Sequence, residues 1–129
     1  MTDIRLRTQK DLVELAALAI GLEGPFVDDD DFHDPRFGID IDPVFHRATW
    51  DPRDSDGDSF RLLVELKLEV RFDDERHCWI ATDQNSIVIE EGAQEGEEDF
   101  RPAARRAVWY AAAAIGLQMR DRQPRPSVT

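Results

Sequence analysis

Apolar residues recur at helical spacing near the start of the chain, between Thr8 and Gly21. The residues on this shared face are Leu12, Leu15, Ala16, Ala19 and Ile20. Spacings of three and four residues place side chains on one side of an α-helix. Thr8 is a suitable N-cap, and Gly21 is a suitable residue for the turn that ends a helix. The pattern predicts a first helix over roughly 9–20.

A second helix is predicted immediately after a run of acids and turn residues. Asp54 or Ser55 is placed to cap it, and apolar residues continue at intervals from Phe60 to Leu66. A side-chain oxygen at the cap position satisfies a backbone N–H of the first turn. We therefore expect a short amphipathic helix that ends near Leu66.

Three strands are predicted beyond this helix. Val70 and Phe72 alternate with Glu69 and Arg71, which is the period of a half-buried strand. Residues 77–82 and 86–90 form two further strand-like segments, and polar turns separate all three. Short connections of this kind favour an antiparallel meander.

A last helix is predicted to begin after Asp99, with Pro102 in its first turn. Its apolar stripe consists of Phe100, Ala103, Ala104, Ala107, Ala111 and Ile115, widened by Val108 and Ala112. Trp109 and Tyr110 cannot both lie on that stripe, so we expect one of them to reach a partner or a second subunit. Residues 119–129 are predicted to be a flexible tail.

Residues 22–50 show neither a helical nor a strand period. Proline, glycine and aspartate interrupt the segment, and Asp28 to Asp31 form a block of like charge. Apolar residues nevertheless alternate with the acids, including Phe26, Phe37, Ile39 and Trp50. We expect a long acidic loop inserted into the domain and laid on its core.

The length and the order of elements predict a single α+β domain over 1–118. A small antiparallel sheet of about three strands would be packed with three helices, on one face or on both. The 129 residues, 41% of them hydrophobic, are sufficient for one modest core.

The formal net charge of -12 narrows the choice of partner. The negative electrostatic field of such a chain repels nucleic acid and anionic membranes and attracts cationic surfaces. A requirement for solubility is the simpler explanation of the excess of acids. Arg101, Arg105 and Arg106 oppose this trend, and we expect them to pair with the acidic segment 91–99 inside the molecule.

Cysteine content and hydropathy bear on location. Cys78 is the single cysteine, which excludes an internal disulfide, and we expect it to be a buried, inert thiol. No signal-like or membrane-spanning run of about 18 apolar residues is present. The expected location is the cytoplasm, with no membrane association.

Metal binding is weakly supported by the sequence. A calcium loop that places Gly57 at its sixth position would use Asp54 and Asp56, but Pro52 and Leu63 occupy positions that need oxygen ligands. The acidic run at 28–31, with His33 and Asp34, is an alternative site whose simpler explanation is a solvated charge run. No metal or cofactor is therefore predicted.

Catalysis is not predicted either. No nucleophile-elbow turn surrounds any serine, and there is neither a Walker-type loop nor a dinucleotide-binding glycine motif. We interpret the chain as a non-enzymatic protein.

Several segments resemble a family of small phage and prophage proteins described as alpha-beta-alpha sandwiches, mostly of unknown function. The matching segments are Leu12 to Gly21, Trp50-Asp51-Pro52, Asp56 to Leu62, the strand around Trp79, and Ala103 to Val108. They cover about two-thirds of the chain, whereas the acidic insert at 22–47 departs from the family pattern. The resemblance implies an alpha-beta-alpha sandwich-like fold in a protein of a bacterial host cell.

Two functional hypotheses follow. The first is a phage or prophage accessory protein that binds an unidentified protein partner and is compatible with homo-oligomer formation. The alternative is an acidic DNA mimic that inhibits a nucleic-acid enzyme of the host, as in anti-restriction. The candidate partner-binding residues are Trp50, Asp54, Asp56, Asp58, Trp109 and Tyr110.

Overall fold

The computed structural model describes residues 3–30, 35–42, 44–45, 48–94, 96–97 and 99–122, and all structural statements concern these residues. They form a short 3-10 helix η1 (Ile4–Leu6), three α-helices and two three-stranded antiparallel sheets. The predicted α+β class is therefore confirmed.

Side-chain caps fix the starts of the first two α-helices. The Thr8 hydroxyl accepts the backbone N–H of Asp11 at 3.1 Å, and α1 spans Gln9–Ala19. The Ser55 hydroxyl accepts the backbone N–H of Asp58 at 3.1 Å, and α2 spans Asp56–Glu65. Both helices are confirmed, and Ser55 rather than Asp54 is the cap of α2.

The predicted meander is confirmed as one of the two sheets. Strands β4 (Glu69–Asp73), β5 (Cys78–Thr82) and β6 (Val88–Gly92) pair in the order β4-β5-β6. The third strand begins two residues later than predicted and extends into the segment that was expected to be a loop.

The second sheet lies where a long loop was expected, so the loop prediction was wrong. It consists of β1 (Phe26–Asp29), β2 (Arg36–Asp40) and β3 (Thr49–Trp50), paired in that order. The prediction that this segment lies on the core is confirmed, because Ile39 and Trp50 are buried in the main core cluster.

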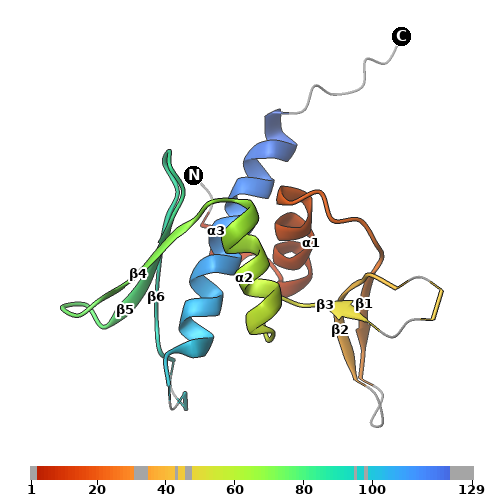
Figure 1. The fold of residues 1–129 in the computed structure, drawn as a ribbon, viewed down its shortest axis with the longest axis horizontal. Coiled ribbons are helices and arrows are strands. Elements are labelled where there is room, and N and C mark those ends of the chain that lie inside the picture. The colour runs from red at the N-terminus through yellow and green to blue at the C-terminus, as the bar shows by residue number, and fades with distance from the viewer. Residues whose placement is uncertain are drawn as a thin grey trace.

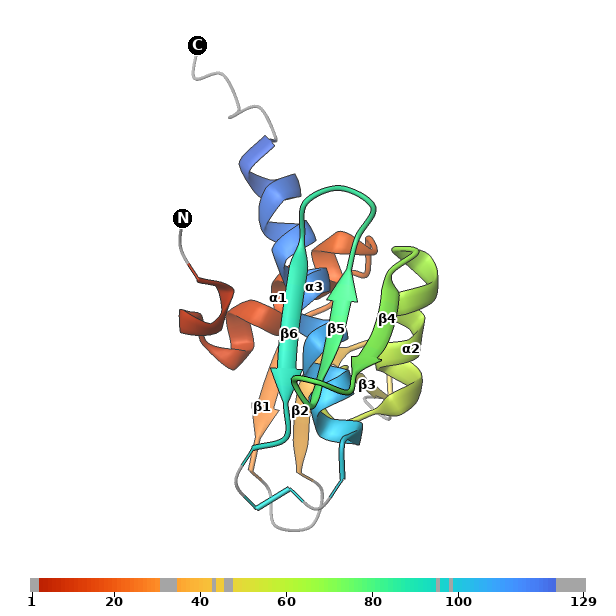
Figure 2. The same ribbon diagram turned by 90° about the vertical axis from the view of Figure 1, so that its left-hand side faces the viewer.

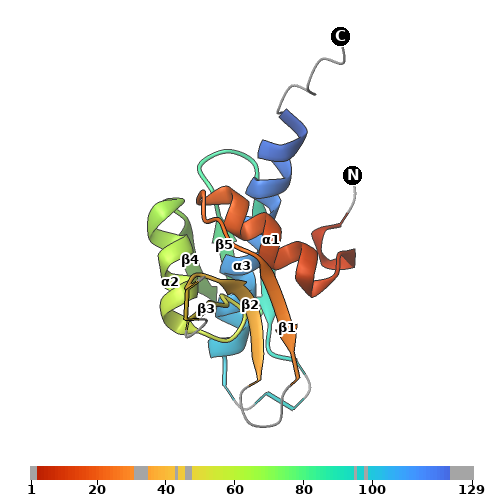
Figure 3. The ribbon, with the colours of Figure 1, turned by 90° about the vertical axis from the view of Figure 1, so that its right-hand side faces the viewer.

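The helices lie between the two sheets, as Figure 1 shows. Helix α3 (Arg101–Arg122) packs against β5 and β6 on one side and against α1 on the other, and α1 contacts β2. Figure 2 shows α3 behind the β4-β5-β6 sheet, and Figure 3 shows α1 and the β1-β2 hairpin on the opposite side of the molecule. Because neighbours surround α3, its buried positions extend beyond the predicted apolar stripe and include Trp109.

Close contact between α1 and α3 depends on a glycine. A Cβ atom added to Gly116 would lie 1.9 Å from the backbone oxygen of Leu15. Small neighbours on the same helix, Ala112 and Ala113, are fully buried. The short side chains therefore allow the two helix backbones to approach closely.

The two ends of α3 agree only in part with the prediction. The Asp99 carboxylate accepts the backbone N–H of Arg101 at 2.9 Å, which supports the expected start. At the other end the helix continues through Arg122, so residues 119–122 are helical, and the rest of the expected tail, 123–129, lies outside the described residues. None of the helices in the described part of the chain has the length and apolar character needed to span a membrane.

Candidate functional site: an acidic cleft

A cleft of about 710 Å³ opens where the β1-β2 hairpin meets the connection between β3 and α2. Carboxylates dominate its lining, which consists of Asp28, Asp29, Asp30, Pro35, Arg36, Phe37, Phe45, Thr49, Asp51, Arg53 and Asp54. The second sheet creates this cleft, because antiparallel pairing places Asp28 opposite Phe37 and Asp29 opposite Arg36. Residues from three parts of the sequence are thereby brought to one surface.

The two arginines of the cleft are held by groups of the same chain. The guanidinium of Arg53 lies 3.9 Å from the centre of the Phe37 ring, and it donates hydrogen bonds to Asp51 at 3.3 Å and to Gln9 at 3.2 Å. A guanidinium placed on an aromatic face is attracted by the ring quadrupole. Arg53 thus forms part of the wall of the cleft and fixes Phe37.

Arg36 is restrained in a similar way on the other side of the cleft. Its Nε donates to the hydroxyl of Thr49 at 3.0 Å, and its guanidinium lies 3.5 Å from the carboxylate of Asp40. Asp40 is only 2% exposed, so this ion pair is largely shielded from water. The positive charge of Arg36 therefore offsets a buried acid and does not neutralise the acids at the rim.

The carboxylates at the rim leave an excess of negative charge. Asp28, Asp30 and Asp54 are exposed, and no hydrogen bond or ion pair between described residues involves their carboxylates. Burial raises the pKa of Asp51, partly offset by the neighbouring charge and hydrogen bonds of Arg53, and the negative charge of Asp54 raises it further. A cationic ligand would lower the energy of all these groups together.

The three predicted aspartates around the start of α2 have separate roles. Asp54 lines the cleft. Asp58 accepts the backbone N–H of Asp51 at 2.9 Å and so fixes the turn before the helix, whereas Asp56 forms a 2.6 Å ion pair with Arg105 of α3. Only Asp54 of this group therefore faces the candidate site.

None of the three aromatic candidates is among the residues that line the cleft. Trp50 and Trp109 are each 1% exposed and belong to the core, so neither presents its ring to a partner. Tyr110 is half-buried, with its ring centre 5.1 Å from that of Trp109, and burial raises the pKa of its hydroxyl. The sequence pattern did not identify Trp109 as a core residue, because its helix, α3, is covered on two sides.

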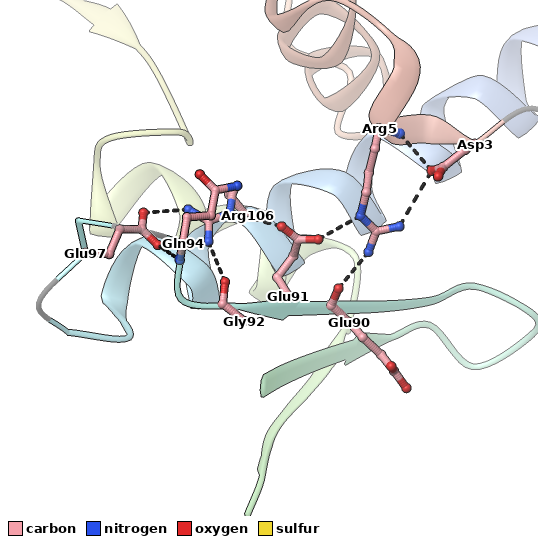
Figure 4. Close-up of polar contacts among 8 residues, drawn as sticks. All are labelled: Asp3, Arg5, Glu90, Glu91, Gly92, Gln94, Glu97 and Arg106. Atoms are coloured by element: carbon pink, nitrogen blue, oxygen red, sulfur yellow. Dashed lines mark hydrogen bonds and ion pairs between the residues drawn. The ribbon is translucent and has the colours of Figure 1, made fainter. Parts of the chain in front are cut away.

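A second charged cluster, drawn in Figure 4, joins distant segments of the chain. Arg106 bonds to Glu91 at 3.0 Å and to Glu97 at 2.7 Å and 3.0 Å, and Arg5 bonds to the other oxygen of Glu91 at 2.7 Å. Arg101 pairs with Asp99 at 2.9 Å. The predicted pairing of arginines with the acidic segment is confirmed for Arg101 and Arg106, and Arg105 pairs with Asp56 instead.

Candidate metal ligands and the single cysteine were also located in the described part of the chain. No three His, Cys, Asp or Glu side chains there are grouped to hold a metal ion, and residues 31–34 of the acidic run lie outside that part. Cys78 is a free, buried thiol, as predicted. Burial raises its pKa, and the nearby charges of Glu90 and Asp73 raise it further.

Comparison with known proteins adds no assignment: no family model, curated protein or solved structure matches the chain.

The sequence patterns indicated Asp54 and the acidic run at 28–31 as candidate site residues, but they did not indicate Arg36, Phe37 or Arg53. No local period marked these three residues, because 26–37 contains four successive aspartates instead of an alternation of polar and apolar residues. They meet at the cleft through the pairing of β1 with β2, which is a tertiary feature.

Proposed function

We propose that this chain is a non-enzymatic binding protein whose acidic cleft receives a cationic segment of a protein partner. The single observation that carries the proposal is the excess of exposed carboxylates at the rim of a concave surface whose own arginines are already paired. The resemblance to small phage and prophage proteins supports an accessory role in a bacterial host cell, and this role is part of the proposal.

The chemistry of the cleft favours a flexible basic segment. Asp28, Asp30 and Asp54 can accept hydrogen bonds from lysine or arginine, and such charge-assisted bonds are stronger than neutral ones. Phe45 is 65% exposed and also lines the cleft. Its ring offers an aromatic surface to the charged group of a partner lysine or arginine, or to the methylene groups of that residue.

Neutralisation of three carboxylates tests this proposal. The variant Asp28→Asn/Asp30→Asn/Asp54→Asn is compared with Glu14→Gln/Asp74→Asn/Glu75→Gln, which removes three exposed charges elsewhere on the surface. Binding of a lysine- and arginine-rich peptide is measured by titration calorimetry at about 0.15 M salt, where charges within about 8 Å still interact.

We expect the cleft variant to bind at least about tenfold more weakly than the control variant, which corresponds to about 1.4 kcal/mol. Equal losses in the two variants would mean that the peptide responds to net charge alone, and the cleft would not be the site.

The alternative, an acidic DNA mimic, has support from the exposed acids of the β1 end, Asp28 and Asp30. A mimic needs carboxylates on a convex surface that fits inside a cationic channel. The concave shape of the cleft and its two arginines favour the first proposal. Inhibition of a restriction-type nuclease by the wild-type chain, lost in the cleft variant, would reverse this preference.

A further inference from the structure

The register of the β4-β5-β6 sheet determines which backbone groups lie along its edges. The backbone N–H of Asp83 donates to the carbonyl of Ile87 at 3.2 Å, next to the pair Thr82 and Val88. Because hydrogen-bonded and non-hydrogen-bonded pairs alternate in an antiparallel ladder, Val88, Glu90 and Gly92 direct their backbone groups away from β5. By the same alternation, Val70 and Phe72 of β4 direct theirs outward at the opposite edge.

The β6 edge is occupied by side chains. Arg5 donates to the carbonyl of Glu90 at 2.6 Å, and Arg106 donates to the carbonyl of Gly92 at 2.8 Å. Two of the three outward carbonyls of β6 are thus satisfied within the chain. A further strand could pair along 90–92 only by displacing these two arginines, and side chains placed in this way are one means by which proteins protect the edges of their sheets.

The β4 edge has no comparable protection. Among the hydrogen bonds of the described residues, none reaches the outward N–H or C=O of Val70 or Phe72. Backbone groups of an edge strand that lack partners are a template for another extended chain.

An apolar groove of about 210 Å³ runs beside this open edge. It lies between α2 and the first half of α3, with Phe60, Leu63, Val70 and Val108 among its lining residues. Figure 2 shows α2 next to β4, beyond the edge of the sheet. On α2, Phe60 is 63% exposed and Val64 is 53% exposed, so the sheet leaves part of the apolar surface of this helix uncovered.

We propose that the β4 edge receives an extended segment of a partner protein as a fourth strand. Such a strand would pair with Val70 and Phe72 through backbone hydrogen bonds. Its side chains opposite these two residues would point toward the helices, where they would cover Phe60 and the groove. Apolar residues are therefore required at alternate positions of the segment.

Charged residues on the other face of β4 determine which side chains the partner segment needs at its remaining positions. Glu69, Arg71 and Asp73 alternate with Val70 and Phe72 and face away from the helices. Opposite charges across neighbouring strands stabilise pairing, whereas like charges destabilise it. The segment therefore carries basic residues opposite Glu69 and Asp73. The net charge of -12 makes a second copy of the chain a poor occupant, because the two copies repel each other.

A peptide with the core Lys-Val-Glu-Val-Lys is the probe, since antiparallel pairing with β4 places its two valines opposite Val70 and Phe72 and its lysines opposite Glu69 and Asp73. The isotope-labelled full-length chain is titrated with this peptide up to about 2 mM, a range that detects the weak binding of short segments. We expect the amide resonances of Val70 and Phe72 to shift and their hydrogen exchange to slow on binding.

Two comparisons make the test specific. Phe60→Ser should weaken binding by at least about fivefold, because the added strand covers that ring. Val88→Ser removes a valine that is 59% exposed on β6, at the opposite edge of the sheet, and should leave binding unchanged. The same peptide with both valines N-methylated cannot pair through those N–H groups and should not bind.

Three results would overturn the proposal. They are an absence of shifts at Val70 and Phe72 at saturating peptide, shifts confined to the acidic cleft, and equal binding by the N-methylated peptide. Concentration-dependent dimerisation of the free chain with the same amides protected would show that the occupant is a second copy and would also overturn it.

Discussion

Replacement of Gly116 by alanine tests the packing of α1 against α3. In an exposed helix interior the change from glycine to alanine stabilises by roughly 0.5–1 kcal/mol, because the unfolded chain loses conformational freedom. At Gly116 the new Cβ would lie 1.9 Å from the Leu15 oxygen and 2.7 Å from its carbonyl carbon. These are backbone atoms, so no side-chain rotation relieves the overlap.

The two helices must therefore separate, and the buried alanines between them lose contact. Overpacking of a core costs about 1–3 kcal/mol, and a clash with backbone belongs at the upper end of that range. After subtraction of the helix-propensity gain, we expect Gly116→Ala to destabilise the protein by about 2 kcal/mol. A chain of this size should then melt about 6–10 °C lower.

Gly57 is the matched control. It lies in the first turn of α2, where an added Cβ would meet only the Ser55 hydroxyl at 3.9 Å. Gly57→Ala should be neutral or stabilise by up to about 0.5 kcal/mol. Urea unfolding followed by tryptophan fluorescence measures both variants, since Trp50 and Trp109 are buried in the core. A Gly116→Ala variant as stable as Gly57→Ala would refute the proposed close packing.

Three further predictions concern the ion-pair network and a helix cap. Arg106→Met should lower the free energy of unfolding by about 3 kcal/mol, because it leaves the nearly buried Glu91 with one partner fewer. Addition of Glu91→Met should recover part of this stability in urea unfolding. Additive losses in the double variant would contradict a coupling between the two residues. Hydrogen bonding to Arg106 lowers the pKa of Glu97 from 4.5, so its contribution to stability is present above pH 4.5 and disappears as the pH falls through the lowered value. Unfolding midpoints of wild type and Glu97→Gln should therefore converge in acid, and a constant difference would exclude this linkage. Ser55→Ala should cost about 1 kcal/mol by thermal unfolding, whereas Ser55→Asp should keep most of the stability; equal losses would show that the hydroxyl is not the cap.

Much of the fold could be predicted from local patterns. Thr8 and Ser55 begin helices through side-chain bonds to nearby backbone, and alternation from Glu69 to Phe72 indicates a strand with two different faces. These signals depend on neighbours within about four residues, so the sequence displays them directly. They were sufficient for the helices α1 and α2 and for the meander.

The β1-β2-β3 sheet could not be predicted in the same way. β3 has only two residues, and β2 has three successive buried residues in place of an alternation. Gly38 was interpreted as an interruption, yet its φ is +129° and an added Cβ would lie 2.2 Å from the oxygen of Trp50. Glycine is required there by a close approach of β3, and that contact depends on the tertiary structure.

The candidate site was predictable only in its charge. The acidic run near Asp28 and the position of Asp54 are visible in the sequence, but the cleft exists because the β1-β2 hairpin folds toward the turn before α2. The burial of Trp109 shows the same dependence. A helix covered by a sheet on one side and by α1 on the other buries residues that a single apolar stripe would leave exposed.

The arginines that occupy the β6 edge have a consequence for growth of the protein into larger assemblies. A fibre of stacked sheets needs two open edges on every molecule, so that each addition creates the template for the next. Here Arg5 and Arg106 close one of the two edges of the β4-β5-β6 sheet. This sheet can therefore accept a strand at β4, whereas propagation through β6 would first require the displacement of these two arginine contacts. Loss of both arginine contacts would open the second edge and convert a single, terminating association into an aggregation hazard.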